Sequence, residues 1–194
     1  LTKPFLKNIL AGIGIFSMQS ETDAERIIDL GATPERVKAA GNMKFDVERT
    51  AKVDERDIRG SLGLNPDELL FVAGSTHKGE EETILQVFKG LVREFPDLRL
   101  LVAPRHVNRA AEIEEVVKKH GFEPMRVSSL GEGRAAKGVR RVLILDTIGR
   151  LNDIYSAAAL VFVGGSLIKH GGHNPIEPAL FGRPVLFGPH MFNF

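Results

Sequence analysis

Residues 160–188 read LVFVGGSLIKHGGHNPIEPALFGRPVLFG and contain a complete pattern of strand, turn, helix and strand. The two ends, residues 160–164 and 184–188, are short runs of mainly Val, Leu and Phe, which predict strands that are buried on both faces. Residues 176–181 between them are predicted to form a short helix. A helix between two buried strands joins them in parallel, so the stretch indicates an α/β fold.

The same alternation of strands and helices is found upstream of this stretch. Further strands are predicted at residues 69–74, 98–103 and 141–145, and further helices at residues 80–95, 109–120 and 151–159. Residues 16–45 add another βαβ-like unit, and the charged residues 46–66 are predicted to form a linking helix and turn. We therefore predict a doubly wound parallel sheet with helices on both faces.

The composition fits one soluble domain, because 43% of the 194 residues are hydrophobic and can form a substantial core. Lys and Arg number 26 against 25 Asp and Glu, so the net charge of +1 does not favour nucleic-acid binding. The absence of Cys excludes disulfides, thiolate nucleophiles and cysteine zinc sites. No apolar run reaches the roughly 20 residues that a membrane helix requires. Because the chain starts at Leu1 and stops soon after a predicted strand, we expect a piece of a longer protein.

Polar turns, three of which contain glycine, follow four of the predicted strands. They are residues 75–80 (STHKGE), 104–106 (PRH), 146–150 (DTIGR) and the turn that begins at residue 164. In an open parallel sheet, ligands bind outside the carboxyl ends of the strands, and these ends lie along one edge. The sequence therefore predicts a ligand site at this edge.

The NPIE segment after the last of these turns is predicted to start a helix that binds an anion. Asn174 is a favoured N-cap residue, Pro175 suits the first helical position, and Glu177 falls at the third. The free N–H groups at such a helix start attract a phosphate, and Gly171 and Gly172 would let a ligand approach the main chain. The Glu177 carboxylate would then accept hydrogen bonds from ribose hydroxyls. The alternative is that Asn174 and Glu177 only cap the helix.

Other polar residues at the same edge allow two interpretations each. Arg105 could bind a carboxylate or phosphate as a planar fork, or it could be an exposed arginine without a ligand. Ser75, Thr76 and the acidic residues 80–82 are predicted to favour the start of a helix, although Lys78 between them could reach an anion at the same edge. His170 and His173, with His77, His106 and His190 also near strand ends, suggest a metal site, but a spacing of three residues in a glycine-rich turn fixes no ligand geometry, so no metal is predicted. An imidazole that holds the turn by a hydrogen bond is the simpler interpretation.

Known catalytic motifs of several large enzyme classes are missing from the sequence. It contains no nucleophile elbow, no Walker-type phosphate loop and no G-x-G-x-x-G fingerprint. Hydrolase, kinase and dehydrogenase functions are therefore disfavoured.

Six ordered motifs resemble those of a known family. They are SMQSETDAERIIDLGA, GNMKFD, GSTHKGEEE, APRH, DTIGRLNDIYSAA and FVGGSLIKHGGHNPIEPALFGRPVLFGPHMFNF. Together they resemble the 3-deoxy-D-manno-octulosonic acid (Kdo) transferases. The resemblance implies a GT-B glycosyltransferase, built from two Rossmann-like domains, of which this chain would be the C-terminal half. We thus expect residues 1–194 to form a single Rossmann-like nucleotide-sugar-binding domain, without the N-terminal acceptor domain and the closing C-terminal helices.

The resemblance also implies a reaction. The full-length enzyme would transfer Kdo from CMP-Kdo to a lipid A precursor in lipopolysaccharide biosynthesis, at the cytoplasmic face of the bacterial inner membrane. The catalytic glutamate, the acceptor site and the membrane anchor would lie in the N-terminal part, so the present chain is expected to be soluble and to bind the donor without transferring it. No cofactor is implied. Alternatives are another GT-B nucleotide-sugar enzyme, such as a UDP-sugar transferase or an epimerase, or a non-catalytic nucleotide-binding module.

The family's CMP contacts can be placed on this sequence by its motifs. They would fall on Pro104, Arg105, Ile148, Gly149, Arg150, Asn174, Pro175, Ile176 and Glu177. One position departs from the family, which usually reads DT-x-GEL where this chain has Arg150. At that position we expect a main-chain contact only.

Overall fold

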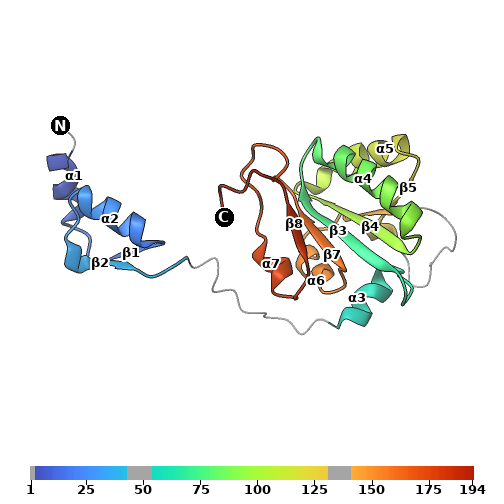
Figure 1. Ribbon diagram of the computed structural model, residues 1–194, viewed down its shortest axis with the longest axis horizontal. Coiled ribbons are helices and arrows are strands. Elements are labelled where there is room, and N and C mark those ends of the chain that lie inside the picture. The colour runs from blue at the N-terminus through green and yellow to red at the C-terminus, as the bar shows by residue number, and fades with distance from the viewer. Residues whose placement is uncertain (1–2, 43–53, 131–140) are drawn as a thin grey trace. The chain divides into compact units, whose positions relative to one another are not determined.

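The computed structural model describes residues 3–42, 54–130 and 141–194, and the chain divides into two compact units, residues 1–50 and 51–194 (Figure 1). The single domain predicted over residues 1–194 does not match this division. The reason lies in the strand pairing, because the two strands of the first unit pair with each other and not with the large sheet of the second. Each unit is described by itself.

The first unit contains a small βαβ arrangement, as predicted for residues 16–45. Its elements are α1 (Lys3–Leu10), β1 (Phe16–Met18), α2 (Glu21–Asp29), the 3-10 helix η1 (Pro34–Arg36) and β2 (Val37–Ala39). Strands β1 and β2 are parallel. Helix α2 begins where the Ser20 hydroxyl accepts a hydrogen bond from the Asp23 N–H at 3.1 Å, which is a normal N-cap.

The second unit is built on a six-stranded sheet in which every pairing is parallel. Its strands are β3 (Leu69–Thr76), β4 (Leu98–Pro104), β5 (Glu123–Arg126), β6 (Arg141–Ile144), β7 (Leu160–Val163) and β8 (Val185–Phe187), in the spatial order β5-β6-β4-β3-β7-β8. The five predicted strands of this unit are confirmed. Strand β5 was not predicted, because its sequence EPMR at the sheet edge has no apolar run.

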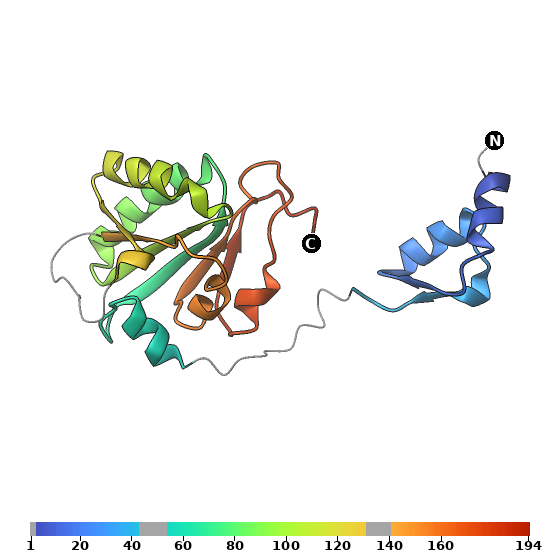
Figure 2. The same ribbon diagram turned by 180° about the vertical axis from the view of Figure 1, so that it is seen from behind.

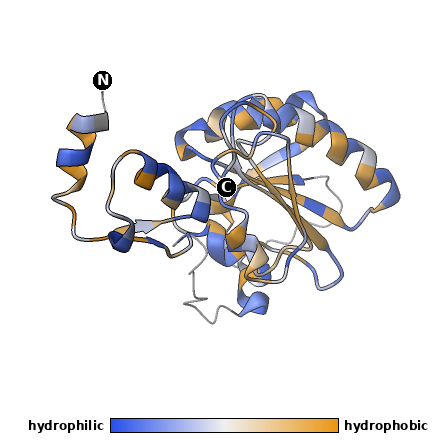
Figure 3. Ribbon diagram, turned by 60° about the vertical axis from the view of Figure 1, so that its left-hand side comes forward, coloured by the Kyte–Doolittle hydropathy of each residue, from blue (hydrophilic) through white to orange (hydrophobic). Residues whose placement is uncertain are grey.

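Helices cover both faces of this sheet (Figures 1 and 2). They are α3 (Glu55–Ser61), α4 (Glu80–Glu94), α5 (Ala110–Lys119), α6 (Leu151–Tyr155) and α7 (Ile176–Ala179), with 3-10 turns η3 (Val107–Arg109) and η4 (Val127–Ser129). Residues of α4 and α5 pack with Phe71 and Ala73, whereas residues of α3 and α6 pack with Leu70 and Val72. Residues 70–73 of β3 are thus all apolar because alternate side chains enter opposite cores, and Figure 3 shows such hydrophobic stretches in orange within the sheet.

The predicted fold class, a Rossmann-like α/β sheet with helices on both faces, is therefore confirmed. No helix within the described ranges has the length and apolarity needed to cross a bilayer.

The order of the strands fixes where a ligand site can form. From β3 the chain builds outward through β4 to β5 and β6, and it then returns to place β7 on the other side of β3. The carboxyl ends of β3 and β7 lie where the direction of winding reverses. In doubly wound sheets a crevice opens at this point and ligands bind there.

Candidate functional site

Strand β3 ends in a bulge that turns Ser75 out of the sheet. The register with β4 shifts between Gly74 and Thr76, so Ser75 has no partner residue. Its φ of 55° is positive, which no other described non-glycine residue shares. Backbone strain and bulges of this kind concentrate beside functional sites.

Gly164 at the end of β7 makes room for this bulge. A Cβ at Gly164 would lie 2.7 Å from the Ser75 carbonyl carbon and 2.7 Å from the Thr76 Cα, and it would overlap the Ser75 carbonyl oxygen. These are main-chain atoms, which cannot move aside as a flexible side chain could. The glycine is therefore needed for the close approach of β3 and β7.

A cavity of about 380 Å³ opens at the carboxyl ends of β3, β4 and β6, next to the reversal point but on the β4 side of β3 and not between β3 and β7. It is lined by Ser75, residues 103–108, Leu145, residues 147–149 and Leu151. Four of the nine predicted contact residues, Pro104, Arg105, Ile148 and Gly149, are among these residues. The structure thus brings two separate predicted motifs together at the predicted edge of the sheet.

Several polar and apolar groups of the cavity lining are exposed or lack a hydrogen-bond partner. Arg105 is exposed, and Ile148 is 85% exposed although it is apolar. Gly149 has a φ of 86° and no atom within 4 Å of the position of a Cβ, so its main chain is accessible from that side. The Thr147 hydroxyl is buried and makes no hydrogen bond. Such unsatisfied groups usually mark a place where a ligand or water binds.

Sequence reasoning missed Ser75 and Thr147 as site residues. Ser75 was expected to take part in starting the helix after β3, and the bulge that exposes it depends on the register with β4. Thr147 lies within the DTIGR turn, next to the predicted contact Ile148. Its position in the turn could have identified it, but its unpaired hydroxyl could not be known from sequence.

The Arg150 side chain contacts Ser61 and not the cavity. Its guanidinium donates a hydrogen bond to the Ser61 hydroxyl at 3.0 Å, and Arg150 is not part of the cavity lining. A side-chain contact with a ligand in the cavity is therefore not available in this arrangement, which agrees with the main-chain role expected there.

The NPIE segment is arranged differently from the prediction. Helix α7 begins at Ile176, with Pro175 in the N-cap position, and not at Asn174. The Asn174 side chain accepts a hydrogen bond from the Ile176 N–H at 3.0 Å and donates one to the Glu177 carboxylate at 3.2 Å. One of the amides expected to bind a phosphate is thus occupied by the protein itself. Residues 174–177 do not line the cavity.

The prediction that Gly171 and Gly172 make room for a ligand is wrong. A Cβ at Gly171 would lie 2.6 Å from the Phe192 ring, and a Cβ at Gly172 would lie 2.9 Å from Met191 Cε. Both glycines are buried, and the Gly171 carbonyl accepts a hydrogen bond from the Asn193 N–H at 3.0 Å. These glycines accommodate the chain's own last residues.

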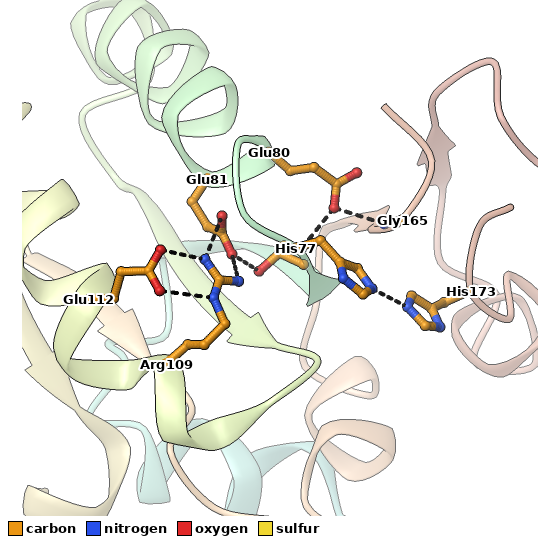
Figure 4. A network of polar contacts seen from close by, with 8 residues as sticks. His77, Glu80, Glu81, Arg109, Glu112, Gly165 and His173 are labelled. Carbon is orange, nitrogen blue, oxygen red and sulfur yellow. Dashed lines mark hydrogen bonds and ion pairs between the residues drawn. The ribbon is translucent and has the colours of Figure 1, made fainter. Parts of the chain in front are cut away.

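Glu80 connects the end of β3 to the turn that follows β7. Its carboxylate is fully buried and accepts hydrogen bonds from the N–H groups of His77 (2.9 Å) and Gly165 (2.8 Å) (Figure 4). It also accepts hydrogen bonds from the N–H groups of Ser166 (3.1 Å) and Leu167 (3.0 Å). Four donors stabilise the buried charge without a cation. The acidic residue predicted to favour a helix start therefore also holds the turn after β7 against the end of β3.

Glu81, next to Glu80, forms a second set of buried hydrogen bonds. Its carboxylate accepts hydrogen bonds from the Thr76 hydroxyl at 2.9 Å and from Arg109 at 2.8 Å, and Arg109 also contacts Glu112 at 3.2 Å (Figure 4). Burial alone would lower the pKa of Arg109, but the hydrogen bonds to Glu112 and Glu81 raise it overall. Arg109 therefore stays charged, and the end of β3 is anchored to α4 and α5.

Three histidines also lie together at this edge. The Nε2 atoms of His77 and His173 are 2.8 Å apart, and the ring nitrogens of His77, His170 and His173 offered to a ligand lie within 4.8 Å of one another. Burial, followed by the neighbouring His77 and Arg105, lowers the pKa of His173 to about 4. The pKa of His77 is also lowered, chiefly by burial and then by His170. His77 and His173 are therefore neutral at pH 7.

Known proteins are similar to this chain in sequence and in fold. The family model described as 3-deoxy-D-manno-octulosonic-acid transferase (kdotransferase) matches residues 1–47. A bifunctional glycosyltransferase/methyltransferase of Fusobacterium nucleatum is 38% identical over 193 residues, which are 98% of this chain and 29% of that protein. A 3-deoxy-D-manno-octulosonic acid transferase of Haemophilus influenzae is 33% identical over 192 residues, 99% of this chain and 44% of that protein. The chain thus spans less than half the length of these relatives.

A solved structure matches over most of its own length. The C-terminal CMP-Kdo binding domain of WaaA from Acinetobacter baumannii is 30% identical, with a TM-score of 0.64. The match covers 72% of this chain and 71% of that domain. Because sequence identity and fold agree over such a share of both molecules, this chain belongs to the Kdo transferase family.

Proposed function

We propose that this chain is the donor-binding part of a Kdo transferase and that it binds the nucleotide of CMP-Kdo in the cavity at the sheet edge. The observation that carries the proposal is the meeting of Pro104 and Arg105 with Ile148 and Gly149 around one cavity. The sequence relatives and the WaaA domain support the identity of the ligand, since they are named for Kdo transfer and CMP-Kdo binding.

Each of these residues offers CMP a different kind of contact. The Arg105 guanidinium, which is exposed at the end of β4, can bind the phosphate as a planar, permanently charged fork. Ile148 presents an apolar surface to the cytosine or ribose. The accessible main chain at Gly149 can exchange hydrogen bonds with the polar edge of the base. Selectivity for cytosine would then depend on main-chain groups.

The predicted contact residues 174–177 have a smaller part in the proposed binding of the nucleotide. Residues 174–177 do not line the cavity, so they contact the nucleotide only where it extends beyond the cavity. There Glu177, held by Asn174, would accept hydrogen bonds from ribose hydroxyls, and Pro175 and Ile176 would complete the surface beside it. Because the Ile176 amide is occupied and α7 has only four residues, attraction of the phosphate falls mainly on Arg105.

The whole protein is proposed to transfer Kdo to a lipid A precursor in lipopolysaccharide synthesis, at the cytoplasmic face of the inner membrane. When Kdo leaves CMP, the phosphate gains negative charge, and Arg105 is placed to stabilise it. Activation of the acceptor hydroxyl needs a general base, which we place outside this chain. Residues 1–194 alone are therefore expected to bind the donor without transferring Kdo.

The proposal is tested by titrating CMP and UMP into the ¹⁵N-labelled 194-residue chain and following amide chemical shifts. We expect CMP to shift the amides of residues 147–149 and to bind more tightly than UMP. An Arg105→Lys variant should bind CMP at least about tenfold more weakly, because lysine lacks the planar fork. Arg93→Lys on the exposed side of α4 is the matched control. No shift near Gly149 at millimolar CMP would contradict the proposal, and a preference for UMP would indicate a UDP-sugar enzyme.

Thr147→Val is expected to weaken CMP binding about fivefold to tenfold without loss of stability. The substitution removes the unpaired hydroxyl while keeping the shape of the side chain, so the folded chain loses no hydrogen bond of its own. A hydroxyl that bonds to the nucleotide contributes about 1 kcal/mol, which gives this change in affinity. Isothermal titration calorimetry measures it, with the exposed Thr83→Val on α4 as control. Equal CMP affinity in both variants would show that Thr147 does not contact the ligand.

A further inference from the structure

Three imidazoles from two distant segments meet where the sheet reverses its direction of winding. His77 directly follows β3, whereas His170 and His173 lie in the turn after the neighbouring strand β7. Their ring nitrogens lie within 4.8 Å of one another. His77 was among the histidines considered in the sequence, but no metal was predicted because the spacing of His170 and His173 in a glycine-rich turn fixes no ligand geometry. His77 adds a third nitrogen from a segment 96 residues away from His173.

The spacing of the nitrogens is close to that of a three-histidine metal site. Zinc binds histidine nitrogen at about 2.0–2.1 Å, so two ligands in a tetrahedral site are about 3.3 Å apart. The Nε2 atoms of His77 and His173 are 2.8 Å apart, and all the ligand nitrogens lie within 4.8 Å of one another. To bind one ion, the rings would shift until the three separations are close to about 3.3 Å.

The cluster offers a cation three nitrogen ligands. Imidazole binds a metal through the lone pair of an unprotonated ring nitrogen. Without an ion, the Nε2 atoms of His77 and His173 lie 2.8 Å apart, so one of them donates its N–H to the other. An ion would replace that hydrogen bond and take the lone pairs of both Nε2 atoms, and the donor ring would then carry its proton on Nδ1.

The backbone that carries the histidines is fixed before any ion binds. The Glu80 carboxylate accepts the N–H of His77 and the N–H of Gly165, and the His173 N–H donates to the Gly164 carbonyl at 3.1 Å. A Cβ at Gly165 would lie only 3.1 Å from the His173 ring, so the glycine leaves the ring its place. Glu80 also contributes a buried negative charge next to His77 (Figure 4). Rigid support of this kind is what a metal site requires.

We propose that His77, His170 and His173 together bind one divalent transition-metal ion of the zinc type. Three imidazoles leave one coordination position open for water or for an oxygen of a bound molecule. His170 is the exposed member of the three. None of the three histidines lines the cavity at Arg105, so the site needs no bound nucleotide to form.

The test is a metal titration of the metal-free 194-residue chain without nucleotide. Zinc is followed by calorimetry, and cobalt by its visible absorption, which reports four-coordinate geometry. We expect one ion per chain with a dissociation constant in the micromolar range or below. His77→Ala and His173→Ala should weaken binding at least about a hundredfold, since each removes one of three ligands.

If His77→Ala or His173→Ala disturbs the fold, two further variants still test the proposal. His170→Ala changes an exposed residue and should weaken binding without changing the thermal transition. His120→Ala is the control, because His120 ends α5, where its ring nitrogen Nδ1 contacts the Val116 carbonyl at 2.9 Å. It should bind zinc like the unchanged chain. Equal loss in His170→Ala and His120→Ala, or binding weaker than about a millimolar, would overturn the proposal.

Discussion

Replacing Glu80 by Gln is expected to lower the free energy of unfolding by about 3 kcal/mol or more. The Glu80 side chain is fully buried, and its two oxygens accept hydrogen bonds from four N–H groups in two segments. Glutamine has nearly the same size but replaces one acceptor oxygen by an NH₂ donor. At least one N–H would then face another donor in a site from which water is excluded, and the charge that strengthened every bond would be lost.

Urea denaturation followed by circular dichroism measures this loss for Glu80→Gln. Glu82→Gln is a matched control, since Glu82 lies two residues further along the same helix and is exposed. It should change the free energy of unfolding by less than about 0.5 kcal/mol. If both variants unfolded at the same urea concentration, Glu80 would not hold the turn after β7.

Most of the sheet could be predicted because its strands are buried on both faces. In β3, Leu70 and Val72 face one core while Phe71 and Ala73 face the other, so the strand is recognisable as an uninterrupted apolar run. The edge strand β5 has the sequence EPMR and none of this pattern. Pairing between β1 and β2 instead of with the large sheet also leaves no trace in either short segment, so the sequence alone suggested one domain.

The edge that carries the cavity could be predicted for a similar reason. Carboxyl ends of parallel strands lie side by side, and Arg105 and Ile148 follow two strands that are both in this sheet. Contacts across long stretches of sequence could not be predicted. Glu80 meets Gly165 across 85 residues, and an acidic residue in a first helical turn suggests only a favourable helix start.

Two glycines also show what the sequence can indicate and what only the fold reveals. Gly171 and Gly172 lie next to the NPIE segment, which made a ligand the obvious neighbour. Their actual neighbours are Met191 and Phe192. Sequence can thus indicate that a position needs a glycine, but the group that takes the place of the side chain is known only from the fold.

Replacing Gly164 by Ala is expected to lower the free energy of unfolding by at least about 2 kcal/mol and to weaken CMP binding. The new methyl group would lie 2.7 Å from the Ser75 carbonyl carbon, and β3 is held there by the Gly164 N–H, which donates to the Gly74 carbonyl at 2.8 Å. Since neither strand can yield alone, the end of β3 must shift, and Ser75 would move out of the cavity lining.

The Gly164→Ala experiment combines urea denaturation with calorimetric titration of CMP. Gly90→Ala is the control, because Gly90 lies within α4 with no atom within 4 Å of a new Cβ. Alanine at that helical position should raise the free energy of unfolding by about 0.5–1 kcal/mol and leave CMP binding unchanged. Unchanged stability and affinity in Gly164→Ala would mean that β3 and β7 are not in close contact at their carboxyl ends. Loss of affinity together with stability would show that the close approach of these two parallel strands shapes the cavity proposed to bind the nucleotide.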